Sequence, residues 1–254
     1  MVRGFYEAAS GVLSQLRNFN VVANNIANVA TAGYKSESLV GSSFAEHFVA
    51  RVGGGDIQQT RNIGRGSFFT ANVDEYTDFT QGSMENTGRE LDMAINGDGF
   101  FMVRTDDMGD VLTRNGQFSV DAEMNLVLPG VGQVLDEGMS PITLESSSLV
   151  VDSSGAIIVD GEETTRIGVF SVEDPDALLH IENKGFFAAE EEPEQAAAAS
   201  YQVVQYTIEK SNVNMAMEMS RVMSGQNLYN ACSQVVKMYD QLNESLVTQI
   251  GRIA

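Results

Sequence analysis

Cysteine, histidine and tryptophan are scarce or missing in this chain. Its 254 residues include one cysteine, Cys232, two histidines, His47 and His180, and no tryptophan. A single cysteine excludes an internal disulfide and a cysteine-rich zinc site, and two distant histidines exclude a multi-histidine metal centre. We therefore expect neither a metal nor a cofactor.

Basic residues and long apolar runs are also few. Against 35 Asp and Glu stand 15 Lys and Arg, for a formal net charge of -20, which would repel a phosphate backbone or an anionic membrane surface. No run approaches the roughly 18 apolar residues that a spanning helix needs, and the N-terminal segment lacks the basic start and apolar block of a cleavable signal peptide. The sequence predicts no nucleic-acid partner, no membrane insertion and no Sec-type export signal.

Proline is confined to the middle of the chain. All four prolines lie in residues 33–204, which carry a net charge of -21, whereas residues 1–32 and 205–254 have no proline and nearly balanced charges. Proline interrupts helices, so its distribution allows long helices at the two ends but not in the middle. We expect the ends and the middle to differ in structure.

Both ends show the spacing of a helix with one apolar stripe. From Phe5 to Ile26, and again from Leu228 to Leu246, apolar or small residues alternate at spacings of four and three. This rhythm places them along one side of a helix that packs against a partner helix. It predicts a helix within residues 1–32 and a second one over roughly 208–250. The interface residues that we predict are Phe5, Val12, Leu16, Phe19, Ile26, Leu228, Val235, Tyr239, Leu242 and Leu246.

The middle of the chain is predicted to be antiparallel β structure. Turn dipeptides such as Asn115-Gly116 and Pro129-Gly130 separate short strand candidates that include 99–104, 126–128 and 156–159. The expected fold is α+β, with long N- and C-terminal helices in a coiled-coil-like layer. The predicted divisions are a discontinuous helical assembly domain at 1–32 and 205–254, an extended connector at 33–80 and a β-rich domain at 81–204.

Candidates for chemistry each have a simpler explanation. A calcium loop at Asn96 to Gly99 would place Ala94 and Thr105 at ligand positions, where neither can serve, so a hairpin turn is expected. The run Gly53 to Gly55 lacks the Lys-Ser/Thr of a phosphate loop. No serine has the surroundings of a hydrolase nucleophile. Cys232 lies on the apolar stripe and is expected to be a small buried hydrophobe.

Carboxylate pairs such as Asp106 and Asp107 are the remaining enzymatic candidates. Two carboxylates could cleave a glycoside, but pairs arise by chance in so acidic a segment, and no tryptophan is present to stack on a sugar. A solvated surface explains them better. We predict no catalytic residues and no enzyme activity.

Four segments of the chain form a recognisable series of motifs. They are ANNIANVATAGYK at 23–35, TQGSMENTGRELDMAINGDGFFMV at 80–103, LTRNGQFSVDAEMNLV at 112–127 and KSNVNMAMEM at 210–219. In this order they resemble the rod and hook proteins of the flagellar basal body. The residues that carry the resemblance are Asn24, Asn25, Asn28, Gly33, Tyr34, Leu91, Asp92, Gly97, Gly99, Phe100, Phe101, Ser211, Asn212 and Val213. The asparagines at 24, 25 and 28 are also expected to bond local backbone groups at the end of the first helix, and the alternative is a contact with another subunit.

The resemblance implies a structural subunit of the flagellar rod whose terminal helices pack with those of its neighbours. It further implies partners among copies of the chain, other rod and hook axial proteins and the flagellar export apparatus, and a location in the basal body after export without a cleaved signal. The length is similar to that of a rod subunit rather than the longer hook protein, and the rod subtype stays open. The alternative is a monomeric β-rich binding module whose terminal helices pair within one chain.

Overall fold

The computed structural model describes most of the chain. The described residues are 2–43, 47–51, 61–66, 70–105, 109–144, 149–159, 162–172, 175, 178–181, 186–188, 194–196 and 200–251. The glycine run Gly53 to Gly55 and the pair Asp106 and Asp107 lie outside them.

Two compact units divide the chain. The first, which we call the helical unit, comprises Met1–Ala23, Glu37–Tyr76 and Ala216–Ala254. The second, which we call the β unit, comprises Asn24–Ser36 and Thr77–Met215. The N- and C-terminal segments thus belong together in one unit although nearly 200 residues separate them in the sequence.

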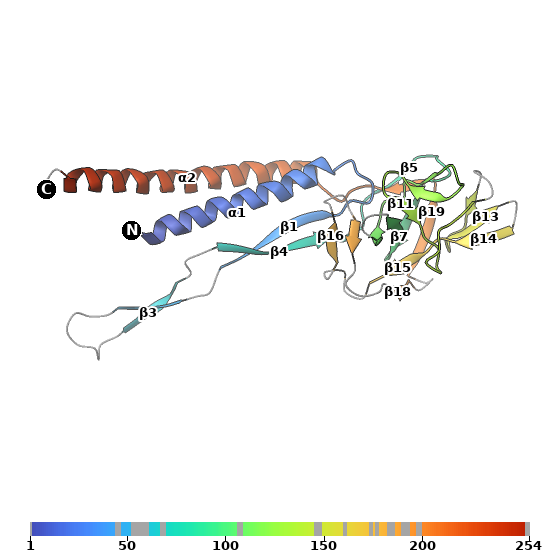
Figure 1. Ribbon diagram of the computed structural model, residues 1–254, viewed down its shortest axis with the longest axis horizontal. Helices are drawn as coiled ribbons and strands as arrows, with labels where there is room; N and C mark the ends of the chain where they lie inside the picture. The colour runs from blue at the N-terminus through green and yellow to red at the C-terminus, as the bar shows by residue number, and fades with distance from the viewer. Residues whose placement is uncertain are drawn as a thin grey trace. The chain divides into compact units, whose positions relative to one another are not determined.

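Two long helices form the helical unit together with paired strands. Helix α1 spans Val2–Ala27 and helix α2 spans Met215–Gly251, and the two lie side by side (Figure 1). The predicted start of the second helix near residue 208 was wrong. Residues Thr207–Glu209 instead form strand β20, which pairs antiparallel with β5 (Met84–Asn86). The ladder to β5 takes up backbone N–H and C=O groups of this segment, which cannot also form the hydrogen bonds of a helix. Helix α2 therefore begins only after Asn214.

The remaining strands run through the middle of the chain (Figure 1). Their bounds are β1 (Ser36–Ser43), β2 (His47–Arg51), β3 (Arg61–Gly66), β4 (Thr70–Asp78), β6 (Met93–Gly97), β7 (Phe100–Thr105), β8 (Gly109–Thr113), β9 (Ser119–Val120), β10 (Leu126–Leu128), β11 (Gly132–Val134), β12 (Val150–Val151), β13 (Ala156–Val159), β14 (Glu162–Arg166), β15 (Val169–Ser171), β16 (Leu179–Ile181), β17 (Phe186–Ala188), β18 (Glu194–Gln195) and β19 (Tyr201–Gln205).

An antiparallel sheet of nine described strands is the largest element of the β unit. Its order is β16-β17-β8-β7-β11-β10-β9, and β15 pairs with β7 and with β18. Apolar side chains from these strands and from β6, β13 and β19 form the main core, which contains Met93, Phe101, Phe118 and Leu126, each with at most 1% of its surface exposed. The α+β fold class predicted from the sequence is confirmed.

The prediction of a hairpin turn at Asn96 to Gly99 was wrong, because the strands on either side of this turn do not pair with each other. Strand β6 pairs with β19, whereas β7 pairs with β8, β11 and β15, so this turn joins strands of different sheets. Gly97 and Gly99 have φ angles of 111° and 124°, which side chains rarely adopt. A Cβ at Gly97 would overlap the carbonyl oxygen of Ser200, so the glycine permits a close crossing of two segments.

Residues 33–80, predicted as an extended connector, contain four strands in their described part. β1 pairs with β4 and β2 pairs with β3, so much of the segment is a paired ribbon. Glu37 of β1 is buried, with 3% of its surface exposed. Burial, and to a lesser extent the charge of Glu75 on β4, raises the pKa of its carboxyl to about 7. The ribbon therefore carries a group that titrates near neutral pH.

We predict that Glu37 makes the helical unit less stable as the pH rises from 5 to 8. The pKa of Glu37 in the folded state lies above its ordinary value of 4.5, so the folded state binds the proton more tightly. That stabilisation is complete below the ordinary value and is lost as the pH rises through about 7. Each unit of pKa shift corresponds to about 1.4 kcal/mol, so the loss should reach about 1–3 kcal/mol. Denaturation of the protein and of Glu37→Gln at both pH values measures it, and an equal loss in the variant would assign the effect to other groups.

Candidate assembly site

Glycines allow α1 and α2 to approach closely. A Cβ added to Gly11 of α1 would lie 3.0 Å from Sγ of Cys232, and one added to Gly225 of α2 would lie 3.0 Å from the ring of Phe19. A Cβ at Gly4 would overlap the hydroxyl of Tyr239. Larger side chains on one helix therefore fill the space that a glycine leaves on the other, and the two helices pair within one chain.

The predicted interface residues separate into three groups. Phe19 and Tyr239 face the partner helix of the same chain, and the ring centroids of Phe19 and Tyr229 are 6.3 Å apart. Leucines remain exposed at Leu16 (44%), Leu228 (51%), Leu242 (53%) and Leu246 (39%). The half-buried members are Phe5, Val12, Ile26 and Val235. Cys232 is half-buried beside Gly11 rather than fully enclosed. The apolar stripe predicted from the sequence thus combines two faces of the helices. One face contacts the other helix of the same chain, and the other face is exposed.

The asparagines at the end of α1 organise the turn that follows it. Asn25 and Tyr34 are fully buried, and the Tyr34 hydroxyl donates to Oδ1 of Asn25 at 3.2 Å. Nδ2 of Asn28 donates to the Asn24 carbonyl at 3.0 Å, and the Thr31 hydroxyl donates to Oδ1 of Asn28 at 3.1 Å. These bonds match the expectation of local backbone contacts at Asn28. They hold the chain where it passes from the helix into the β unit.

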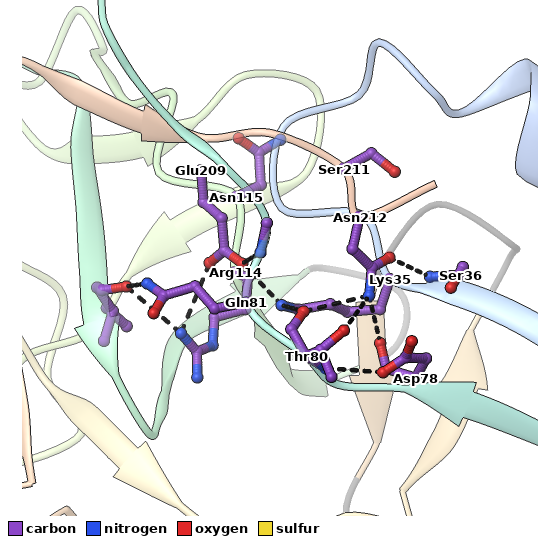
Figure 2. Close-up of polar contacts among 12 residues, drawn as sticks. Lys35, Ser36, Asp78, Thr80, Gln81, Arg114, Asn115, Glu209, Ser211 and Asn212 are labelled. Atoms are coloured by element: carbon purple, nitrogen blue, oxygen red, sulfur yellow. Dashed lines mark hydrogen bonds and ion pairs between the residues drawn. The ribbon is translucent and has the colours of Figure 1, made fainter. Parts of the chain in front are cut away.

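A buried ion pair joins distant segments of the β unit (Figure 2). The Lys35 ammonium lies 2.7 Å from Oε1 of Glu209, and each side chain is 1% exposed. The backbone N–H of Gly82 also donates to Oε1 of Glu209, at 2.8 Å, and Lys35 donates to the Thr80 carbonyl at 2.9 Å. Because these groups come from the segment after α1, the segment after β4 and strand β20, one cluster ties three parts of the chain together.

Arg114, just after β8, is the third charged member of this cluster. Its guanidinium lies 3.6 Å from Oε2 of Glu209 and donates to the Gly97 carbonyl at 2.9 Å, and its side chain is 7% exposed. Burial lowers the pKa of both Lys35 and Arg114, while the Glu209 carboxylate opposes that shift in each case. One carboxylate therefore compensates two buried cations, which makes Glu209 the centre of what we call the junction cluster: Lys35, Arg114 and Glu209.

Asn212, within the Ser-Asn-Val segment, connects the chain ahead of α2 to two other segments (Figure 2). Its Oδ1 accepts from the Ser36 N–H at 2.8 Å, and its Nδ2 donates to the carbonyls of Asp78 and Thr80 at 2.7 and 3.1 Å. The Ser211 hydroxyl accepts from the N–H of Val213 at 3.2 Å, and Val213 is buried. The segment therefore fixes the chain before the helix begins.

The motif residues of the β strands are core and turn residues. Phe100 and Phe101 are buried in the two apolar cores, and Leu91 packs against the larger one. Asp92 is 1% exposed, accepts from the Thr87 hydroxyl at 2.6 Å and pairs with Arg89 at 3.2 Å. These residues therefore support the fold.

Sequence reasoning missed the junction cluster. Arg114 and Glu209 were not singled out, and Lys35 was noted only as the last residue of a motif. One signal in the sequence could have found them, because all three charges lie in or beside segments that resemble the family. Lys35 is the only charged residue in GYK and Arg114 is the only one in TRN. Glu209 directly precedes the segment that begins at 210.

No group of three or more His, Cys, Asp or Glu in the described part of the chain is placed to hold a metal ion. Among the described helices, none has the length and apolar character needed to cross a membrane. What the described residues do offer is an exposed apolar surface on two helices and a buried cluster that fixes the segments next to them.

Three family models match the chain. The "Flagella basal body rod protein" model matches residues 5–35, the "Flagellar hook protein FlgE/F/G D1 domain" model matches residues 94–159, and the "Flagellar basal body rod FlgEFG protein C-terminal" model matches residues 204–250. The first and last cover much of α1 and α2 with the segments next to them, and the middle one covers the larger part of the main sheet.

Full-length relatives agree with these matches. The chain is 30% identical to the flagellar basal-body rod protein FlgG of Bacillus subtilis, over 97% of this chain and 98% of that protein. It is 28% identical to the flagellar basal-body rod protein FlgF of Caulobacter vibrioides, over the whole of both chains. It is also 25% identical to the flagellar hook-basal body complex protein FlhO of Bacillus subtilis, again over both whole chains. The chain therefore belongs to the flagellar basal-body rod protein family.

Proposed function

We propose that this protein polymerises through its terminal helices into the flagellar rod, the axial drive shaft of the basal body. The family supports a structural subunit of the basal body. Polymerisation through the helices is the further step, and the exposed apolar side chains on α1 and α2 support it.

The exposed leucines of the two helices are the observation that carries this proposal. Leu13 and Leu16 on α1 and Leu228 and Leu242 on α2 each have between 44% and 63% of their surface exposed. Full burial of a leucine side chain contributes roughly 1.5–3 kcal/mol. Packing against neighbouring subunits would recover part of that free energy at every leucine. This gain favours association of the helices of one chain with the helices of other subunits.

The distribution of charge supports the same division of roles. Residues 1–32 and 205–254 are nearly neutral, whereas the residues between them carry a net charge of -21. Close contacts between identical subunits cost least where the surfaces are uncharged, because repulsion is poorly screened in a water-excluded contact. The acidic middle can remain in solvent, where the screening length is about 8 Å. We propose that the two ends are the assembly domain and that the β-rich middle is the outer domain.

The proposed partners are copies of this chain and the rod and hook axial proteins that adjoin it. The proposed location is the basal body, reached through the flagellar export apparatus without a cleaved signal. No enzymatic step is part of this function, because the structural role is carried by packing alone.

We predict that Leu242→Asp prevents assembly into the rod and abolishes swimming. The substitution removes the gain of burying a leucine and places a carboxylate where the contact would have to exclude water. Since Leu242 is exposed in the single chain, the subunit itself should still fold. Swimming of complemented cells and electron microscopy of their basal bodies are the measurements.

Asn230→Asp is the matched control for Leu242→Asp. Asn230 is exposed on the same helix but lies outside the apolar spacing, so the variant adds the same charge at a different face and should swim normally. Complete rods in Leu242→Asp cells would show that α2 is not the assembly element. If the purified protein also kept full helicity as a monomer at every concentration, the monomeric binding module would be the better description.

A further inference from the structure

Methionine supplies most of the oxidisable side chains of this protein. The sequence has 12 methionines, one cysteine and no tryptophan. Four of the methionines, at positions 215, 217, 219 and 223, lie close together at the beginning of α2. The sulfur of a thioether is soft and is readily oxidised to a sulfoxide. A dense group of methionines is therefore a candidate site of modification, provided that an oxidant can reach it.

Three of these four methionines are exposed on the folded chain. Met217 is 54% exposed, Met219 is 53% exposed and Met223 is 62% exposed, and we call these three residues the α2 methionine cluster. Met215, which precedes them, is half-buried. Met219 and Met223 are four residues apart, so they are neighbours on the same side of the helix. An oxidant in solution can therefore reach the cluster without any unfolding of α2.

The methionines in the cores of the β unit provide the contrast. Met93 is fully buried in the main core, and Met102 is 3% exposed within the smaller one. An oxidant would have to enter a core before it could react there, and the sulfoxide that formed would lie among apolar side chains. The fold thus protects the methionines of the two cores and leaves those of the α2 methionine cluster accessible.

We propose that the α2 methionine cluster is an oxidation site of the unassembled subunit, and that sulfoxides at this site prevent assembly. The oxidant is a hydroperoxide, which transfers one oxygen atom to each thioether sulfur. The O–O bond breaks and an S–O bond forms, so the sulfur is oxidised while hydrogen peroxide is reduced to water. The effect on assembly rests on the proposed function, whereas the oxidation site itself does not.

The physical reason for the effect is the change from an apolar to a polar side chain. The cluster lies in residues 205–254, which are part of the proposed assembly domain. At an exposed position the sulfoxide oxygen is solvated, so α2 keeps its structure. In a contact between subunits that oxygen would lose its water. The burial of even one methionine corresponds to roughly a tenfold or larger change in an association constant, so the loss of three such contributions should block the contact.

Peptide mass spectrometry after treatment with hydrogen peroxide tests the site. The full-length protein is treated at a concentration at which it is monomeric, and tandem mass spectra assign each sulfoxide to a residue. Met217, Met219 and Met223 should be oxidised at least roughly tenfold faster than Met93 and Met102, because reactivity follows exposure. Circular dichroism checks that the helical content is unchanged. Equal rates at the exposed and the buried methionines would overturn the proposed site.

Sedimentation velocity tests the effect on assembly. It compares untreated protein, peroxide-treated protein, and treated protein after reduction by the two kinds of methionine sulfoxide reductase, which act on the two sulfoxide epimers. Treatment should raise the protein concentration needed for assembly by about tenfold or more, and reduction should restore the original value. If treated and untreated protein assemble equally well, sulfoxides at this site do not control assembly and that part of the proposal is wrong.

Leucine variants assign the effect to this cluster. Met217→Leu/Met219→Leu/Met223→Leu removes the sulfur atoms and nearly keeps the apolar volume, so peroxide should not change its assembly. Met238→Leu is the matched control. Met238 is 53% exposed on the same helix but lies outside the cluster, so this variant should remain sensitive to peroxide. Sensitivity that persists in the triple variant would assign the effect to another methionine and overturn the proposal.

Failure of the proposed function gives a different result. If the untreated protein stays monomeric at all concentrations, polymerisation through the terminal helices is wrong, and the effect of oxidation on assembly fails with it. The order of oxidation in the monomer is measured separately and still decides whether the α2 methionine cluster is the oxidation site.

Discussion

Glu209→Gln is expected to lower the free energy of unfolding of the β unit by about 3–5 kcal/mol, the usual cost of breaking a buried ion pair from one side. Glu209 compensates two buried cations, Lys35 at 2.7 Å and Arg114 at 3.6 Å. The amide oxygen of Gln can still accept the hydrogen bond from the Gly82 N–H. The loss of stability therefore measures mainly the removal of the negative charge. Chemical denaturation followed by circular dichroism measures it.

Glu85→Gln is the matched control for Glu209→Gln. Glu85 pairs with Lys210 on the adjoining β5–β20 ladder, but both of these side chains are more than half exposed. Exposed ion pairs contribute about 0–1 kcal/mol, so the same substitution should change stability by less than that. Equal losses in the two variants would mean that the junction cluster does not tie the β unit together.

The faces of the helices could be predicted from the sequence only in part. Apolar spacing predicted two terminal helices correctly, because leucine, valine and phenylalanine mark the period of a helix. It left pairing within one chain as an alternative and did not identify Gly4, Gly11 and Gly225, which line that contact, because glycine adds nothing to an apolar pattern. A glycine contributes to packing through the close approach that it permits, and only the structure shows which larger side chain fills the space.

The junction cluster could not be predicted, for a different reason. Lys35, Arg114 and Glu209 lie far apart in the sequence, and local patterns contain no information about which distant charges will meet. Their meeting depends on the pairing of β20 with β5, a three-residue ladder that was predicted as the first turn of a helix. The motif residues were found by resemblance, but their roles as turn, core and hydrogen-bonding groups required the structure.

The second large effect is expected for Gly33→Ala, which should destabilise the β unit by several kcal/mol. Gly33 has a φ angle of 68° and its N–H donates to the Glu209 carbonyl at 2.8 Å. A Cβ here would overlap the backbone of Arg114 and Asn115, which cannot move aside as a flexible side chain could. The left-handed conformation costs about 1–3 kcal/mol for a residue with a side chain, and overpacking adds about 1–3 kcal/mol.

Gly88→Ala separates these two contributions. Gly88 has nearly the same φ angle, 72°, but nothing lies within 4 Å of its Cβ position, so this variant has only the conformational cost. Thermal or chemical unfolding of both variants gives the difference, which measures how tightly residue 33 is held against the segment at 114–115. If the two variants lose the same stability, the segment after β8 yields to the added methyl group. If Gly33→Ala loses much more, the turn after α1 is held rigidly against the segment at 114–115 within the β unit, where Lys35, Arg114 and Glu209 meet.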